Sequence, residues 1–219
     1  MLWQAPRRKA NIANGKRTRG VKSFPVIVNV VVLTKAKGPF DIEQLSTALP
    51  RMVYEPETFP GLIYRRQQPK ATIIMFSTGK IASTGSKSER VARESLRATA
   101  SDISCLTGQN VVLNRIKTEN VVAMFDIGDI IDVEEFAARY PDTIYEPRRF
   151  PGAICRLVRS VTVLVFRTGK MVSVGSKSEN EGRSSIRSVC RALHRLHCIG
   201  HTRTSELVET EHSSRPIRS

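Results

Sequence analysis

Residues 54–65, YEPETFPGLIYR, return as YEPRRFPGAICR at residues 145–156, an offset of 91. A second block, FSTGKIASTGSKSE at 76–89, returns as FRTGKMVSVGSKSE at 166–179, an offset of 90. Two long blocks that recur in the same order mark an internal duplication. The chain therefore holds two copies of one unit of about 90 residues. The residue that the second copy lacks falls in a turn that matches residues 67–70, where a deletion is tolerated.

Each copy predicts the same order of elements. Residues 25–34 are β-branched and strand-like, and residues 40–49 predict a helix with Asp41 as its N-cap. A hairpin, a further strand and a long helix opened by a Ser-x-x-Glu capping pattern follow; in the first copy they span 62–66, 71–77, 81–85 and 86 to about 103. The second copy ends with a strand at 172–175 and a helix from 178 to about 196. We expect an α+β fold in which two tandem, pseudo-symmetric repeats build one antiparallel sheet with helices on one side. Its parts are a basic arm, two repeats and a tail, at residues 1–22, 23–110, 111–200 and 201–219.

The predicted sheet is apolar on both faces. Within residues 72–76, strict alternation puts Ile73 and Met75 on one face but Ile74 and Phe76 on the other. The central strands behave alike: alternation sets Val28, Val30 and Val32 against Asn29, Val31 and Leu33, and Val121 against Asn120, Val122 and Met124. Four helices are too few to cover both faces of a sheet of about eight to ten strands, so one apolar face is left as an interaction surface.

The charge favours a nucleic-acid partner. The formal net charge is +15, and residues 1–22 hold seven basic residues and no acid. That arm either touches phosphate or directs nuclear import, or it is a solvated leader. Residues 23–200 keep a net charge of +8. Such a balance favours nucleic acid over a membrane surface or an acidic protein.

Other classes of protein fit less well. No apolar run is long enough to span a membrane, and the N-terminus lacks the apolar stretch of a secretory signal. The four cysteines have no CxxC spacing and are interpreted as reduced intracellular thiols: Cys105, Cys155, Cys190 and Cys198.

An apolar sheet face with basic residues at its strand ends suits the minor groove of DNA, which apolar side chains can widen and wedge open. The repeated blocks resemble the TATA-box-binding protein family over roughly residues 24–198. This resemblance implies a saddle whose concave sheet sits on the minor groove and whose helices lie on the convex side, with no cofactor and no enzymatic activity. It also implies that two pairs of phenylalanines kink the DNA at the ends of the site, Phe59 with Phe76 and Phe150 with Phe166.

The resemblance assigns further DNA contacts in matched pairs. The amides of Asn29 and Asn120 donate to base acceptors on the floor of the groove. The neighbouring groove-facing positions are Val31, Ala82 and Thr84 in the first copy and Val122, Val172 and Val174 in the second. Backbone contacts fall on Arg65, Thr78, Lys80 and Lys87 in the first copy and on Arg156, Thr168, Lys170 and Lys177 in the second.

Two departures from the family pattern concern selectivity and partners. Val174 stands where the family carries threonine, which removes a hydroxyl from one half-site and puts strict TATA preference in doubt. Arg148 and Arg149 stand in a loop that is acidic in the family and docks transcription factor IIB, so we expect a divergent partner or an altered docking polarity. The expected partners are double-stranded promoter DNA, factors like transcription factors IIB and IIA, and the RNA polymerase machinery, with no membrane. The expected location is the nucleus, or a viral transcription compartment.

The favoured function is a transcription initiation factor that binds and bends promoter DNA.

Motifs for other chemistry do not fit their required spacing. The stretch from Gly79 to Gly85 with Lys80 lacks the spacing of a P-loop. Cys190, His194, His197 and Cys198 lie along one helix and cannot surround zinc tetrahedrally. Two alternatives stay open: a scaffold that recruits proteins through its convex helices, and a metal-dependent nuclease that uses the acidic run Asp126, Asp129, Asp132, Glu134 and Glu135.

Overall fold

The structure, a computed structural model, describes residues 24–48, 51–157 and 161–200. The arm and the tail expected at residues 1–22 and 201–219 lie outside the described residues. The first repeat contains β1 (Val26–Lys35), α1 (Ile42–Ala48), β2 (Met52–Val53), β3 (Leu62–Arg66), β4 (Ala71–Met75), β5 (Lys80–Ser86) and α2 (Glu89–Thr107). The second contains β6 (Lys117–Asp126), α3 (Val133–Arg139), β7 (Thr143–Ile144), β8 (Gly152–Arg156), β9 (Thr162–Phe166), β10 (Lys170–Ser176) and α4 (Glu179–Arg195).

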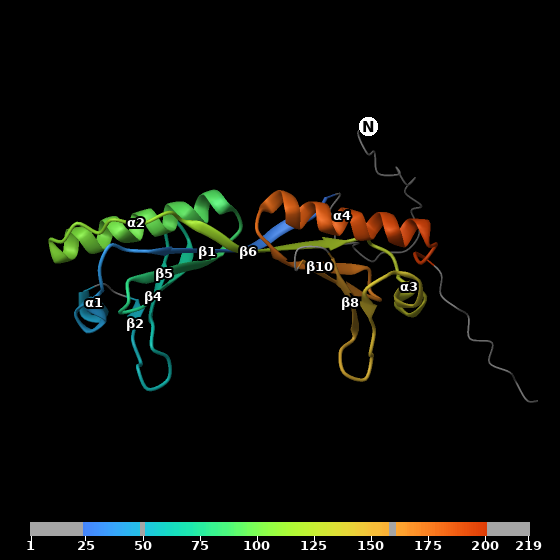
Figure 1. Cartoon of the computed structure of the whole chain (residues 1–219), viewed down its shortest axis with the longest axis horizontal. Coiled ribbons are helices and arrows are strands. Elements are labelled where there is room, and N and C mark those ends of the chain that lie inside the picture. Colours follow the sequence, from blue (N-terminus) through green and yellow to red (C-terminus); the bar gives the residue numbers. More distant parts are fainter. Residues whose placement is uncertain (1–23, 49–50, 158–160, 201–219) are drawn as a thin grey trace, which may run out of the picture.

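All ten strands form one antiparallel sheet in the order β2-β3-β4-β5-β1-β6-β10-β9-β8-β7. Each strand of the first repeat has its counterpart at the mirrored place in this order, so exchange of the two repeats leaves the order unchanged. The repeats join where β1 pairs with β6, for example Val30 with Val121 and Val31 with Asn120. The resulting sheet curves into a saddle, with α2 and α4 along its convex side (Figure 1). A hanging loop projects below each half, at residues 54–61 between β2 and β3 and at residues 145–151 between β7 and β8 (Figure 1). The expected α+β fold of two tandem repeats is confirmed.

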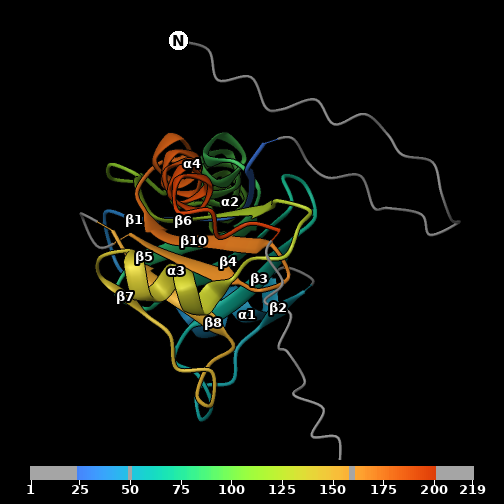
Figure 2. The same ribbon diagram turned by 90° about the vertical axis from the view of Figure 1, so that its right-hand side faces the viewer.

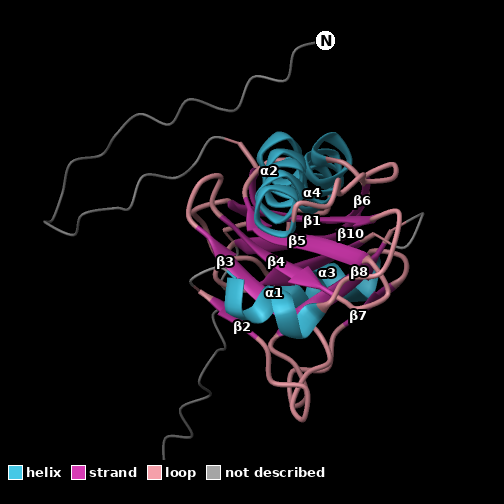
Figure 3. Cartoon of the chain, turned by 90° about the vertical axis from the view of Figure 1, so that its left-hand side faces the viewer, coloured by secondary structure: helices cyan, strands magenta, loops and turns pink. Residues whose placement is uncertain are grey.

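The core lies between the sheet and the helices. Helix α2 covers the strands of the first repeat and α4 those of the second, one after the other along the convex side, and α1 and α3 lie at the two ends of the saddle (Figures 1, 2 and 3). The end helices bury Leu45 and Phe136 in the same hydrophobic cluster. Buried hydroxyl pairs tie each long helix to its strand: Ser83 to Ser95 at 2.8 Å and Ser173 to Ser185 at 2.7 Å. The duplication therefore repeats packing detail as well as topology.

In the first repeat, the long helix α2 begins two residues later than its capping pattern predicts. Ser88, not Ser86, is the N-cap of α2, and its hydroxyl accepts a hydrogen bond from the Val91 N–H. Ser86 is the buried last residue of β5 and donates to the Lys70 carbonyl. Two residues separate β5 from α2, so Ser86 ends the strand and Ser88 caps the helix. The caps of α1 by Asp41 and of α4 by Ser178 agree with expectation.

The strict alternation expected for β1 is wrong at its start, because a β-bulge interrupts the strand there. The register against β6 shifts between Ile27 and Asn29, so that Ile27, not Val28, joins Val30 and Val32 in the core. A bulge inserts one extra residue and reverses the facing of everything on one side of it. Asn29 and Val31 keep their expected side.

Candidate nucleic-acid interface

Two rows of apolar side chains cross the concave face. In the first repeat, adjacent strands align Ile63, Ile74, Ala82 and Leu33; in the second they align Ile154, Leu164, Val172 and Met124. All eight are half-buried or exposed, and Leu33 is 38% accessible. Sequence reasoning missed Ile63, Ile154 and Leu164 as members, although Leu164 follows Ile74 at the repeat offset of 90. The expected uncovered apolar face is present among the described residues.

The two central asparagines are held in the same way. The side-chain oxygen of Asn29 accepts from the Gly85 N–H at 2.8 Å, and that of Asn120 accepts from the Gly175 N–H at 2.8 Å. Because the amide oxygen is engaged, the amide NH₂ is the group left to meet a ligand. Thr84 adds a hydroxyl bond to Asn29 at 3.3 Å. Val174, at the matched position, has no hydroxyl to offer Asn120.

A pair of phenylalanines stands at each end of the saddle. Phe59 and Phe76 have ring centroids 5.9 Å apart at an interplanar angle of 62°, and Phe150 and Phe166 are 5.7 Å apart at 64°. In each pair one ring comes from the hanging loop; the other is Phe76, directly after β4, or Phe166, the last residue of β9. All four are half-buried. The pairs are thus preformed, partly exposed and nearly identical.

A glycine beneath each pair lets the rings approach the sheet. A Cβ on Gly61 would lie 2.6 Å from Phe59 Cε1, and a Cβ on Gly152 would lie 2.9 Å from Phe166 Cε1 and 3.0 Å from Phe150 Cε1. Both glycines are buried. Only a residue without a side chain therefore allows this ring arrangement without a shift.

The predicted cations lie at or beside the ends of strands β3, β5, β8 and β10. Tight turns hold Thr78 before Lys80 and Thr168 before Lys170, with Gly79 and Gly169 at φ of 83° and 87°. The two threonines and the two lysines are exposed, as are Arg65, Lys87, Arg156 and Lys177. Such side chains at the rim of an apolar surface suit contacts with phosphates.

One rim lysine has a partner that sequence reasoning missed. The Lys177 ammonium donates to the Glu119 carboxylate at 2.8 Å and to its carbonyl at 2.7 Å. That hydrogen bond and the charge of Lys177 lower the pKa of the Glu119 carboxyl. The first repeat has Val28 at the position of Glu119, so the two halves differ here.

The hanging loops have the same backbone but different charge. Phe59 N–H bonds to the Glu55 carbonyl at 2.8 Å, and Phe150 N–H bonds to the Glu146 carbonyl at 2.9 Å. The first loop carries Glu55 and Glu57 with no base. The second carries Arg148 and Arg149, both exposed, and the Arg149 guanidinium lies 3.2 Å from the Glu146 carboxylate. The ends of the saddle therefore differ in sign.

The acidic run has a structural role. Asp132 caps α3 by accepting from the Glu135 N–H, and Asp126 and Asp129 accept from backbone N–H groups in the preceding turn. Among the described residues no group of three or more His, Cys, Asp or Glu side chains is placed to hold a metal ion. The described cysteines form no disulfide, and only Cys105 is exposed. No helix in the described part of the chain is long and apolar enough to cross a membrane.

Comparison with known proteins agrees with this geometry. The family model for transcription factor TFIID, or TATA-binding protein, matches residues 24–106 and again residues 115–196. The TATA-box-binding protein of Methanocaldococcus jannaschii is 37% identical over 165 residues, which cover 74% of this chain and 90% of that protein. That of Aeropyrum pernix is 33% identical over 183 residues, 80% of this chain and 88% of that protein.

A solved structure extends the likeness to three dimensions. The structure titled Methanococcus jannaschii TBP superposes with a TM-score of 0.66 at 35% identity, covering 78% of this chain and 99% of that one. Two matched repeats, a saddle-shaped ten-stranded sheet and relatives of this identity lead to one conclusion: the chain belongs to the TATA-binding protein family, a family of DNA-binding transcription initiation factors and not of enzymes.

Proposed function

We propose that the chain binds the minor groove of A·T-rich promoter DNA with its concave face, bends the DNA by inserting the two phenylalanine pairs, and thereby nucleates a transcription initiation complex. The observation that carries this proposal is the pair of matched, edge-to-face phenylalanine clusters at the ends of an uncovered apolar face. An apolar ring inserted at a base step replaces part of the lost stacking, which offsets an unstacking cost of about a few kcal/mol.

The test is DNA bending by the variant Phe59→Ala with Phe150→Ala. Resonance energy transfer between dyes at the two ends of a short A·T-rich duplex reports the bend. We expect the wild-type protein to bring the dyes together and the variant to bind weakly without bending, because its rim cations remain. Undiminished bending by a folded variant would disprove the wedge assignment.

We propose that selectivity is asymmetric between the half-sites. Thr84 supplies a hydroxyl beside Asn29, whereas Val174 supplies a methyl group beside Asn120. Selection of bound sequences from random duplexes should yield a strict A·T preference in the half that meets the first repeat and a looser one in the other half. Val174→Thr should restore the missing preference, and Thr84→Val should remove the existing one.

We propose that Arg148 and Arg149 dock a partner related to transcription factor IIB through an acidic surface. Their guanidinium groups replace the acidic side chains of the family loop. Arg148→Glu with Arg149→Glu should abolish recruitment of the chain's own partner and favour a partner that has a basic docking surface. Promoter binding places this activity where transcription occurs, which we expect to be the nucleus; imaging of a tagged copy in its own cell tests this location.

A further inference from the structure

A row of arginines follows α4 on the side of the molecule opposite the concave face. The row consists of Arg183, Arg187, Arg191 and Arg195, which we call the arginine ridge. Residues four apart in a helix lie on the same side, so the ridge is one continuous line. After a first turn that holds Glu179 and Glu181, α4 has no acidic residue. The ridge is therefore a strip of uniform positive charge on the convex surface.

Part of the ridge has a structural role. The Arg183 guanidinium donates to the Pro25 carbonyl and lies 3.6 Å from the Glu179 carboxylate. Arg195 lies in the last turn of α4, where a cation stabilises the helix dipole. Arg187 and Arg191 have neither a hydrogen bond nor an ion pair with any residue in the described ranges, and Arg191 is exposed. The fold itself does not use these two charges.

The matched helix of the first repeat is built differently. At the positions of Arg191 and Arg195, α2 has Ser101 and Cys105. Helix α2 also has acidic residues along its length, and Glu94 forms an ion pair with Arg90 at 2.6 Å. Like charges four residues apart cost a helix about 0.2–0.5 kcal/mol per pair. The like charges of the ridge are thus destabilising, and its last two arginines have no counterpart in the first repeat, which points to a ligand.

We propose that the arginine ridge binds an acidic segment of a partner protein. Successive ridge residues are spaced by about 6 Å along the helix axis, close to the roughly 6.7 Å between alternate residues of an extended chain. Carboxylates at alternate positions of such a segment meet successive guanidinium groups, each able to form a bidentate pair. A duplex would offer two phosphate strands, yet the neighbouring positions Ser184 and Ser188 supply no second row of cations. The ridge lies opposite the concave sheet, so this inference stands whether or not the sheet binds DNA.

The test uses a fluorescein-labelled peptide of alternating glutamate and serine, titrated with the full chain at physiological salt and followed by anisotropy. We expect Arg187→Glu with Arg191→Glu to weaken binding by about tenfold or more, because two attractive contacts become repulsive. The neutral pair Arg187→Gln with Arg191→Gln should give a smaller loss. The matched control, Arg90→Glu with Arg97→Glu on α2, carries the same change in net charge and should bind nearly as the wild type does.

Three results would overturn the proposal. The first is an equal loss in the α2 control, which would show that the peptide senses only net charge. The second is an equal loss of binding to a G·C-rich duplex in the α4 variant, which would make the ridge a nucleic-acid surface. The third is about a tenfold gain in peptide affinity on removal of residues 201–219, which would make the chain's own Glu206, Glu209 and Glu211 the occupant. Thermal unfolding of each variant identifies any that fails to fold, and only variants that unfold at the wild-type temperature are compared.

Discussion

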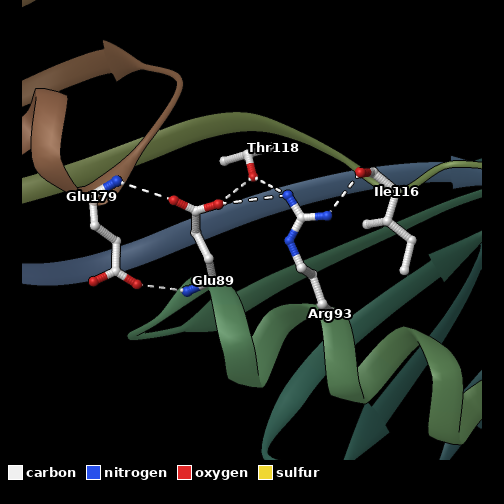
Figure 4. Close-up of polar contacts among 5 residues, drawn as sticks. All are labelled: Glu89, Arg93, Ile116, Thr118 and Glu179. Atoms are coloured by element: carbon white, nitrogen blue, oxygen red, sulfur yellow. Dashed lines mark hydrogen bonds and ion pairs between the residues drawn. The ribbon is translucent and has the colours of Figure 1, made fainter.

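Glu89 and Glu179 cap each other's helices across the centre of the saddle. The Glu89 N–H donates to the Glu179 carboxylate at 2.8 Å, and the Glu179 N–H donates to the Glu89 carboxylate at 3.1 Å (Figure 4). Thr118 and Arg93 also bind the Glu89 carboxylate, and Arg93 continues to the Ile116 carbonyl at 2.8 Å. The first residue of each long helix thus depends on the other repeat, which couples the two halves.

This coupling predicts a pH-dependent stability. Partial burial raises the pKa of the Glu89 carboxyl, but hydrogen bonds from Thr118 and the Glu179 N–H, with the contribution of Arg93, outweigh burial and lower it below 4.5. A carboxyl whose pKa is lowered by folding stabilises the protein at any pH above its pKa in the unfolded chain. This stabilisation is lost as the pH falls through the pKa in the folded protein. We expect Glu89→Gln to be less stable than wild type near neutral pH and to approach it as the pH falls through the lowered pKa of the folded-state carboxyl. Urea unfolding across this range measures the gap; a constant gap would contradict the prediction.

The asparagine geometry predicts the effect of a single-atom change. In Asn29→Asp or Asn120→Asp, one carboxylate oxygen keeps the bond to Gly85 or Gly175, but the other replaces the amide donor. That oxygen faces the acceptors of an A·T minor groove, so each variant should lose about 1–3 kcal/mol of binding free energy. Titration of an A·T-rich duplex measures the loss. Asn180→Asp, on the first turn of α4, is the matched control and should bind normally.

The glycines beneath the rings predict a second route to a bending defect. Gly61→Ala and Gly152→Ala force the phenylalanine rings to shift, and crowding of this kind costs about 1–3 kcal/mol of stability. The displaced rings should bend DNA less, in the same energy-transfer assay. Gly182→Ala is a fair comparison, because the nearest atom to its Cβ is 3.5 Å away. Normal bending by both folded ring-site variants would count against preformed wedges.

The rim lysines predict the salt dependence of binding. Each phosphate contact contributes about 0.9 to the slope of log affinity against log salt concentration. Lys80→Ala and Lys170→Ala should each reduce the slope by about that amount, and Arg97→Ala on the convex side should leave it unchanged. Lys177→Ala should reduce affinity less than Lys87→Ala, since Lys177 must first leave Glu119. Equal slopes for all the variants would refute the phosphate assignment.

Thiol reactivity tests the packing beneath the sheet. Burial raises the pKa of the Cys155 thiol to about 11 and that of the Cys190 thiol to about 12, and it also raises the pKa of Cys198. These thiols stay protonated near pH 8, and the thiolate is the reactive form. One thiol, the exposed Cys105, should react quickly with a disulfide reagent in the native protein. Cys105→Ser should remove the fast phase and leave the slow ones.

The duplication made much of this structure predictable. Two copies of one pattern must fold alike, so a single sheet with matched helices follows from the repeat, and the pairing of Phe59 with Phe76 and of Phe150 with Phe166 follows from the family resemblance. The misses concern features fixed by neighbours far along the chain. The bulge at Val28 depends on the register of β1 against β6, and the Lys177–Glu119 pair joins residues 58 positions apart. Strands β2 and β7 have two residues each, too few to show a periodicity.

The central pairing of β1 with β6 makes the chain a covalently tethered equivalent of a two-fold symmetric dimer. Two separate copies of one repeat would meet through the same antiparallel seam, as an isologous interface requires. Linkage replaces their concentration-dependent association by an effective concentration of about millimolar. It also frees each half to change alone, as no homodimer can. Val174 stands at the position that matches Thr84, and Arg148 stands in the loop that matches an acidic one. Two identical subunits could not differ in this way.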